Sequence, residues 1–297
     1  MPTYVPLGFG SYHWSQTEPD GRRFFVTVGD LGHAPDPEAA CASLEAALDA
    51  SARLRDEAGL SFVVAPVRSV SGDVLRRIPP HLAVSVFPFI DGRSGNWGDD
   101  LAPAERDELF RLLAELHRAP LGLAPGIRGE GGRPPFLTEL TESLARSDEI
   151  WTGGPFSEPA RHLLLDQREL LAQWLGEFHS LAQRCGADSD RRVLTHGETH
   201  PGNLMRSDGR LLLIDWDTLG TALPERDLWT WDDGTKECFA AYEAAAGRPV
   251  DPVACAFFRL AWDLRDLVSY LNLFRSPHDH GPDSEKAWRV FSSLLRG

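Results

Sequence analysis

Hydrophobic and polar positions change their period along this chain, and the first part reads as antiparallel strands. Runs rich in β-branched and aromatic residues predict strands at 4–14, 22–31, 61–66 and 81–89. The cluster Glu-Pro-Asp-Gly separates the first two runs and ends in an Asp-Gly pair, which is typical of a hairpin turn. We therefore expect the chain to begin with a β-hairpin.

One helix interrupts these strands. An Ala- and Leu-rich stretch at 38–59 follows two prolines and ends at Gly59, a pattern that predicts a helix. Residues 67–80 are expected to carry the turn between the last two strands. The predicted order is β-β-α-β-β, up to about residue 88.

After a Gly- and Asp-rich connector at 90–100, apolar residues recur at helical spacing, which indicates helices packed on a core. The stripes run from Leu109 to Leu116, Leu171 to Ala182, Phe257 to Leu271 and Trp288 to Leu295. The sequence therefore predicts an α+β protein, with a β-rich part at 1–88 and a mostly helical part at 89–297.

A β island breaks the helical part. The sequence "GNLMRSDGRLLLIDWD", at 202–217, reads as a strand, a Ser-Asp-Gly turn and a second strand. The polar stretch "LTHGETHPGNLM" leads into this hairpin, and Asp215 and Asp217 follow it. We expect the turn to bring Asn203 and Asp215 together.

Composition limits the class of protein. With 297 residues and 42% hydrophobic residues the chain can bury a sizeable core. It has no apolar run long enough for a membrane span, and its first residues do not resemble a signal peptide. The four cysteines are scattered without a CxxC pair, which is typical of reduced thiols. We expect a cytoplasmic protein with no membrane partner.

The net charge of −14 argues against a nucleic-acid partner, because such binding needs a basic face. An acidic surface suits a cationic small substrate, although the acidity also serves solubility alone. The basic residues are nearly all arginine, and the two lysines are Lys236 and Lys286.

The spacing His196-x-Glu198-x-His200 invites a zinc hypothesis, which the context disfavours. The HExxH and HxxEH metalloproteases carry their ligands on a helix, and Pro201 with Gly202 would break that helix. Zinc deaminases pair HxE with a CxxC motif, which this sequence lacks.

Phosphoryl transfer fits the same stretch better. It needs a carboxylate beside the attacking hydroxyl, and an amide and a carboxylate to hold magnesium on the phosphates. Glu198, Asn203 and Asp215 supply these three groups.

These motifs resemble those of the aminoglycoside phosphotransferase family. "HGETHPGNLM" followed by "LLLIDWD" is similar to its catalytic signature, "GFGSYHW" to its glycine-rich loop and "PERDLW" to its downstream acidic motif. The resemblance covers most of the chain and is closest to the spectinomycin-type and other actinobacterial antibiotic phosphotransferases. It implies a protein-kinase-like fold of two lobes, divided near residue 88, that binds ATP or another nucleoside triphosphate with Mg²⁺. The implied activity is phosphorylation of a hydroxyl group on a small molecule.

The resemblance also implies roles in catalysis. Glu198 stands where the family has its catalytic aspartate, and Asn203 and Asp215 stand at the magnesium ligands. His196 would anchor the loop, while Asp217 and Asp227 would brace either the loop or the substrate side.

For the nucleotide, the resemblance points to the glycine-rich loop and the connector between the lobes. Backbone N–H groups at Gly8 and Gly10, with the Ser11 hydroxyl, would approach the phosphates. The adenine would lie near Phe87 and Phe89. The alternatives are a plain hairpin for the glycines and ordinary core packing for the two phenylalanines.

Two positions depart from the family pattern. The family has aspartate where this chain has Glu198. Kinases of this fold carry a lysine on the third strand, where this chain has Thr27, and no lysine precedes residue 236. A phosphate-binding cation from the first 88 residues would then be an arginine, or magnesium and backbone amides would act alone. The candidates are Arg22, Arg23, Arg53, Arg55, Arg68, Arg76 and Arg77.

These departures keep other functions open. The leading hypothesis is a kinase of a small hydroxylated molecule, and an antibiotic is the expected substrate. One alternative is a relative with weak or no catalysis that binds a nucleotide or ligand. The other is a kinase of a small metabolite.

Overall fold

The computed structural model describes residues 2–6, 11–32, 34, 36–127, 129, 134–186, 189–235 and 237–296. The chain forms two compact units. The first comprises residues 1–129 and 190–250, and the second comprises residues 130–189 and 251–297. The expected division near residue 88 falls inside the first unit and stays a prediction.

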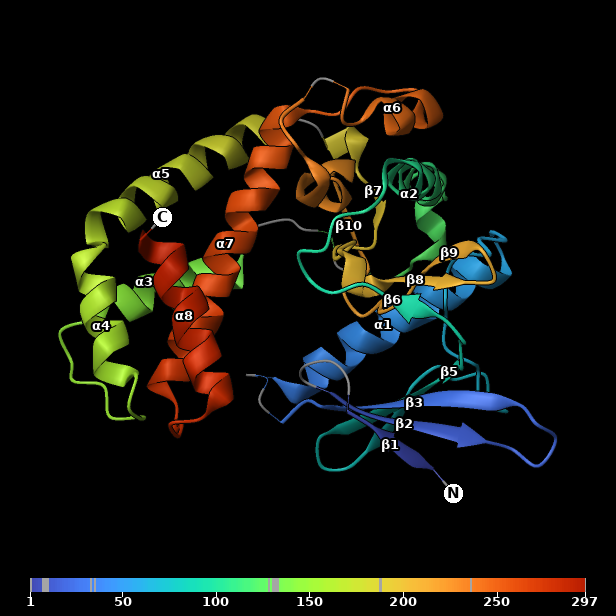
Figure 1. The fold of residues 1–297 in the computed structure, drawn as a ribbon, viewed down its shortest axis with the longest axis horizontal. Helices are drawn as coiled ribbons and strands as arrows, with labels where there is room; N and C mark the ends of the chain where they lie inside the picture. The colour runs from blue at the N-terminus through green and yellow to red at the C-terminus, as the bar shows by residue number, and fades with distance from the viewer. Residues whose placement is uncertain are drawn as a thin grey trace. The chain divides into compact units, whose positions relative to one another are not determined.

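The first unit begins with an antiparallel sheet, blue to teal in Figure 1. Its described strands follow the order β1-β2-β3-β5-β4. Their bounds are β1 Thr3–Val5, β2 Ser11–Thr17, β3 Arg23–Asp30, β4 Arg76–Ile78 and β5 Leu82–Pro88. The expected hairpin of the first two runs is β2–β3, in which Ser11 lies opposite Gly29 and Thr17 opposite Arg23.

Helix α1 (Pro37–Asp56) belongs to the core of the first unit (Figure 1). The Asp36 side chain caps it by accepting from the N–H groups of Glu38 and Ala39, and Pro37 occupies its first turn. Its buried residues share one hydrophobic cluster with Ala83 of β5. The sheet therefore turns the face that carries Ala83 toward the interior of this unit.

In the rest of the first unit, the polar stretch at 196–203 connects the short strands β7 and β8. These elements are β6 Arg93–Ser94, α2 Pro103–Leu116, β7 Val193–Thr195, β8 Leu204–Ser207, β9 Arg210–Leu213, β10 Gly220–Ala222 and α6 Ala240–Ala246. The strand order is β6-β8-β9 in one small sheet and β10-β7 in the other. The expected β8–β9 hairpin is confirmed, and its turn residues Asp208 and Gly209 both have positive φ.

The second unit is helical in its described part. Its helices are α3 Pro135–Ala145, α4 Ser157–Asp166, α5 Arg168–Cys185, α7 Pro252–Arg275 and α8 Pro282–Arg296. They bury one hydrophobic cluster, to which Leu171, Leu264, Phe274 and Phe291 contribute without exposed surface. The stripes predicted to begin at Leu171, Phe257 and Trp288 lie on these helices, and the stripe from Leu109 to Leu116 lies on α2 of the first unit.

Two sequence predictions were wrong in detail. Residues 61–66 form no strand, and Val63 makes a single bridge to Leu213. Phe62 to Ala65 are nevertheless buried, and a short apolar run cannot distinguish a buried loop from a strand. The expected turn at 67–80 contains the strand β4.

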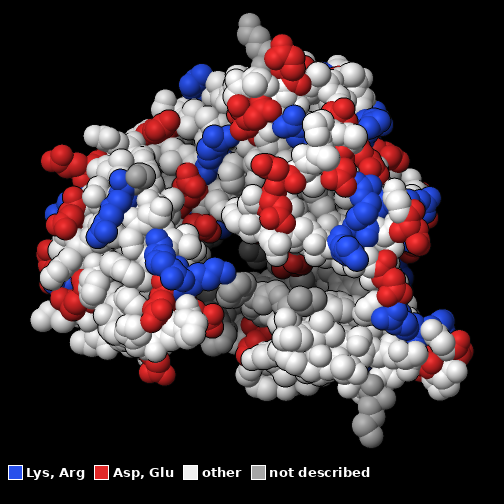
Figure 2. Space-filling view, in the orientation of Figure 1, with Lys and Arg blue, Asp and Glu red and all other residues white. Residues whose placement is uncertain are grey.

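No helix in the described part of the chain is long and apolar enough to cross a membrane. Acidic and basic side chains are interspersed on the face shown in Figure 2. The negative charge is therefore spread over this face and does not gather in one patch.

The helical core gives a stability prediction. Replacing the fully buried Phe291 by alanine should lower the free energy of unfolding by about 3–5 kcal/mol, because it removes apolar contacts and leaves a cavity. The neighbouring Val290 is 41% exposed, so Val290→Ala is the matched control and should change little. Urea unfolding of both variants measures the difference, and equal midpoints would contradict the assigned core.

Candidate functional site

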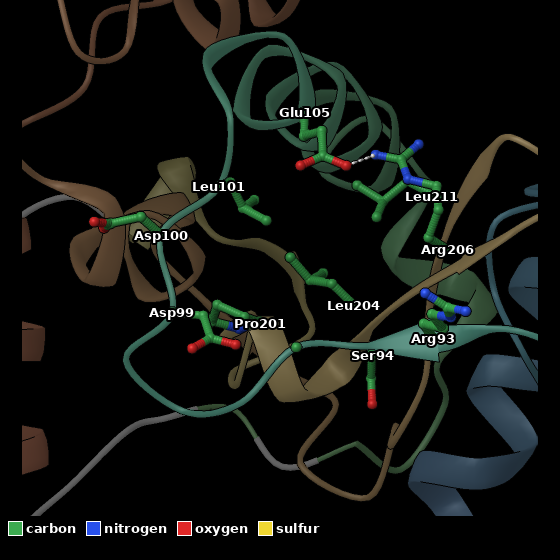
Figure 3. A pocket seen from close by; sticks show the side chains of 11 residues that line it. Arg93, Ser94, Asp99, Asp100, Leu101, Glu105, Pro201, Leu204, Arg206 and Leu211 are labelled. Atoms are coloured by element: carbon green, nitrogen blue, oxygen red, sulfur yellow. Dashed lines mark hydrogen bonds and ion pairs between the residues drawn. The ribbon is translucent and has the colours of Figure 1, made fainter.

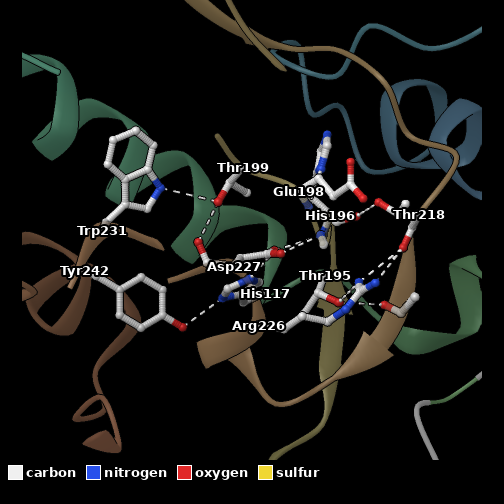
Figure 4. Close-up of polar contacts among 12 residues, drawn as sticks. His117, Thr195, His196, Glu198, Thr199, Thr218, Arg226, Asp227, Trp231 and Tyr242 are labelled. Atoms are coloured by element: carbon white, nitrogen blue, oxygen red, sulfur yellow. Dashed lines mark hydrogen bonds and ion pairs between the residues drawn. The ribbon is translucent and has the colours of Figure 1, made fainter. Parts of the chain in front are cut away.

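A buried carboxylate fixes the start of the polar loop. Asp227 has no exposed surface, and its carboxylate oxygens accept from the backbone N–H groups of His196, at 2.8 Å, and Gly197, at 2.6 Å. The Nε2 atom of His117, which follows α2, lies 3.1 Å from the same carboxylate. The Nδ1 atom of His117 lies 2.8 Å from the hydroxyl of Tyr242 (Figure 4). Groups from distant parts of the first unit therefore hold the loop, and Asp227 braces it.

His196 joins this loop to the segment that carries Asp215. Its ring is fully buried, with Nε2 2.8 Å from the carbonyl oxygen of Ile214 and Nδ1 3.3 Å from the N–H of Glu198. Nε2 must donate to that carbonyl, while Nδ1 accepts. Burial lowers the pKa of His196, in agreement with a neutral ring. These contacts support the anchoring role expected for His196.

The glycine in this loop is required by its surroundings. Gly197 has a φ of 98°, in the left-handed region, and a Cβ atom there would collide with the guanidinium of Arg226. Arg226 donates from Nη1 to the Thr195 hydroxyl at 2.9 Å and to the Thr218 carbonyl at 3.1 Å. Glu198 directly follows this turn, and Figure 4 shows its carboxylate directed away from the buried Asp227.

The β8–β9 hairpin brings Asn203 and Asp215 together, as predicted. Leu204 lies opposite Leu213, and the N–H of Ile214 donates to the carbonyl oxygen of Asn203 at 3.0 Å. The Asn203 side-chain nitrogen donates to the Glu198 carbonyl at 2.9 Å. With the nitrogen used in this way, the amide oxygen of Asn203 is the group that could bind a cation.

Three carboxyl groups gather beyond the hairpin. Asp215 adopts a φ of 64°, which is uncommon outside glycine, and its carboxylate hydrogen-bonds to the carboxyl group of Asp217. Desolvation and the charges of Asp215 and Glu198 raise the pKa of Asp217 to about 8. Asp215 and Asp217 keep solvent-exposed surface, and the neighbouring negative charges disfavour ionisation of Asp217 there. Repulsion of this kind is what a bound cation relieves.

The donor atoms of this site suit magnesium. Amide and carboxylate oxygens are the hard ligands that Mg²⁺ prefers, and Mg²⁺ commonly binds one or two carboxylates, several waters and substrate phosphates. Within the described ranges, no three His, Cys, Asp or Glu side chains form a complete metal cage. Asn203 and Asp215 therefore fit an ion that also depends on phosphate oxygens.

The predicted nucleotide-binding residues have mixed surroundings. Gly8 and Gly10 lie outside the described residues, and Ser11 begins β2. Phe87 packs partly buried against the core of the first unit. The Phe89 ring lies 3.7 Å from the Arg23 guanidinium carbon. Both aromatic residues thus have packing roles, and their contact with adenine stays a prediction.

Sequence reasoning missed two residues that contact or support the loop. Trp97, in the connector, packs edge-to-face against the ring of His200 with centroids 4.6 Å apart. The Nδ1 atom of His200 accepts from the N–H of Gly202 at 3.1 Å. His117 continues the i, i+4 spacing of Leu109 and Leu113, which was the available sign that it points inward. For Trp97 the sequence offers no such sign.

A cavity of about 220 Å³ lies beside the loop (Figure 3). It is lined by the connector, the start of α2 and the β8–β9 hairpin, and the Glu105–Arg206 ion pair, at 2.9 Å, lies along its wall. Pro201 and Leu204 contribute to it, but Glu198, Asn203 and Asp215 do not. The residues predicted to carry the chemistry therefore lie outside this cavity.

The fold and this loop define a class of protein. The chain belongs to the phosphotransferase enzyme family, whose model matches residues 5–258. The expected kinase-like α+β fold and the expected class of activity, small-molecule phosphotransfer, are confirmed. No curated protein matches the sequence.

Solved structures share this fold at low sequence identity. A spectinomycin phosphotransferase in complex with ADP and spectinomycin is 15% identical with a TM-score of 0.76, over 100% of this chain and 89% of its own. An amicoumacin kinase in complex with AMP-PNP, Ca²⁺ and Ami is 14% identical with a TM-score of 0.59, over 99% and 86%. The choline kinase LicA from Streptococcus pneumoniae is 16% identical with a TM-score of 0.53, over 99% and 93%.

The Asp227 network gives a prediction about stability. Asp227→Ala should lower the free energy of unfolding by at least about 3 kcal/mol, because the N–H groups of His196 and Gly197 lose a buried acceptor. Chemical denaturation measures the change. Asp56→Ala, at an exposed carboxylate, is the control and should unfold like the native protein.

The pH dependence of this loss has a defined sign. Burial alone would raise the pKa of Asp227, but the hydrogen bond from His117 and the attraction of nearby positive groups lower it below the usual value. The contribution of Asp227 is therefore present above the unfolded pKa of about 3.9 and is lost as the pH falls. The gap between native protein and Asp227→Ala should shrink in acid; a constant gap would contradict this account.

Proposed function

We propose that this chain transfers the terminal phosphoryl group of ATP, or of another nucleoside triphosphate bound with Mg²⁺, to a hydroxyl group of a small-molecule antibiotic. The observation that carries the proposal is the joint placement of Asn203, Asp215 and Glu198 by one hairpin and one braced loop. The likeness to the spectinomycin phosphotransferase and the amicoumacin kinase supports an antibiotic substrate.

In this mechanism Glu198 orients the acceptor hydroxyl and takes its proton. The hydroxyl oxygen forms a bond to the terminal phosphorus while the bond from that phosphorus to the bridging oxygen breaks, and a nucleoside diphosphate leaves. Asn203 and Asp215 would hold Mg²⁺, which supplies positive charge to the phosphate oxygens. His196 and Asp227 keep the loop in place and take no part in proton transfer.

A weakly catalytic binding protein is the second candidate, and the residues Glu198 and Thr27 favour it. Glutamate moves the carboxylate by about one ångström relative to aspartate, and a misplacement of that size can cost about 100-fold in rate. ATP consumption across a panel of antibiotics and amino alcohols distinguishes the candidates. Resistance of a susceptible host that expresses the chain then separates an antibiotic substrate from a metabolite.

Asp215 should be the least replaceable residue in the site. Asp215→Asn removes the charge but can keep the positive φ, since asparagine tolerates that region. We expect turnover to fall by at least about 100-fold with an unchanged melting temperature, because the charge that would hold Mg²⁺ is lost. Asp208→Asn, also at positive φ but in the turn of the β8–β9 hairpin, is the matched control. Substantial turnover by Asp215→Asn would reject the assignment.

Glu198 has a separate test. Glu198→Gln should lower turnover by about 100-fold or more, because the amide can neither accept the proton nor carry the charge. Glu198→Asp should also be slower than the native enzyme, because the shorter side chain withdraws the carboxylate by about one ångström. Glu115→Gln, at an exposed position of α2, is the control in the same assay. Faster turnover by Glu198→Asp would instead indicate a relative that has lost activity.

A further inference from the structure

The position of the missing lysine has a histidine beside it. The register of β2 and β3 places His13 directly opposite Thr27. The Nδ1 atom of His13 lies 3.2 Å from the Thr27 hydroxyl oxygen. The ring stacks on Phe25, with centroids 5.0 Å apart and planes 23° apart. Thr27 and Phe25 thus fix the imidazole, and no described residue makes a hydrogen bond to its Nε2 atom.

His13 faces the same region as the magnesium-binding candidate. Its side chain belongs to the face of the sheet that carries Thr27 and Ser85, which are successive cross-strand neighbours. Ser85 is buried, and this is the face that turns toward the interior of the first unit. The Asp215 carboxylate attracts a proton on His13, although the larger effect, burial, lowers the pKa of this histidine. His13 on β2 and Asp215 after β9 therefore interact electrostatically within the first unit.

The arginines of the first 88 residues are engaged elsewhere or face away. The pairs are Arg22 with Asp20, Arg23 with Asp91, Arg53 and Arg68 with Asp49, Arg77 with Glu38, and Arg55 with the Val63 carbonyl. Arg76 lies opposite Val84, so its side chain is on the other face of the sheet from His13. An arginine substitute stays a prediction, but each candidate other than Arg76 already has a partner in this structure.

We propose that His13 replaces the strand lysine, with its Nε2–H group donating to a phosphate oxygen of the bound nucleoside triphosphate. This inference rests on the proposed function. In this proposal the Thr27 hydroxyl is the donor to Nδ1, so that the proton of the neutral ring is on Nε2. Threonine at the lysine position is then the residue that orients the substitute. Because a neutral N–H group replaces an ammonium, most of the charge compensation passes to Mg²⁺.

Two substitutions at His13 separate the two ring nitrogens. The amide of His13→Asn reaches about as far as Nδ1, so it can keep the contact with Thr27 while it loses the phosphate donor. The longer amide of His13→Gln can place an N–H group near the Nε2 position. Tyr12→Ala, on the same strand but the opposite face, is the matched control.

Calorimetric titration with Mg²⁺ and a non-hydrolysable ATP analogue, and separately with adenosine, tests the proposal. His13→Asn should bind the analogue about tenfold more weakly, the effect of one hydrogen bond to a charged group, and adenosine as tightly as the native protein does. His13→Gln should retain most of the affinity. The double variant His13→Ala/Thr27→Lys should regain affinity for the analogue, because the lysine returns to its strand position.

The outcomes distinguish this inference from the proposed function. If the native protein binds neither probe, the proposed function fails and the role of His13 fails with it. If the native protein binds the analogue and His13→Asn binds it equally well, only the role of His13 is rejected. An equal loss of adenosine and analogue affinity in His13→Asn also rejects it, because such a loss reports general damage to the sheet.

Discussion

The arrangement of the site depends on one carboxylate that water does not reach. The loop after β7 turns through Gly197 and leaves helix and strand geometry, so its backbone N–H groups need another acceptor. Asp227 accepts two of them, and His117 pairs with the same carboxylate. Each of these buried groups would be costly to leave without a partner, so the arrangement forms together or not at all. The direction in which Glu198 leaves the loop follows from this network.

A second constraint concerns charge. The hairpin that places Asn203 beside the Asp215 segment also brings Asp217 and Glu198 into mutual repulsion, which a protein does not retain for stability alone. The positive φ of Asp215 is a further local cost. Strain and crowded carboxylates at the same place are typical of sites whose stability is completed by a ligand. The ligand proposed above, a metal-bound phosphate, fits the oxygen donors of this place.

Features that arise locally could be predicted from the sequence. The Asp208-Gly209 turn fixes the β8–β9 hairpin, and therefore the proximity of Asn203 and Asp215. The apolar stripes predicted the buried faces of the helices, because helical spacing is also a local property of the sequence. The segment 61–66 and the strands β7 and β10 could not be predicted, because they are short and are placed by partners far along the chain. His117 and Asp227 are 110 residues apart in the sequence, so no local sequence pattern predicts that they pair.

The lysine expected on the third strand is replaced by Thr27, and the sequence motif alone does not determine what this replacement means for the mechanism. From the motif alone, threonine at the lysine position favours a relative that has lost catalytic activity. The register of β2 and β3 changes this interpretation. Cross-strand neighbours share a face of the sheet, and the residue opposite Thr27 is His13, which the charge of Asp215 influences. The loop meanwhile keeps its full set of braces, including the glycine that leaves room for Arg226. Under the proposal made above, a neutral imidazole at this place would shift the neutralisation of phosphate charge toward the metal. If His13 has the role proposed here, Thr27 reflects a redistribution of roles within the same site and not the loss of that site.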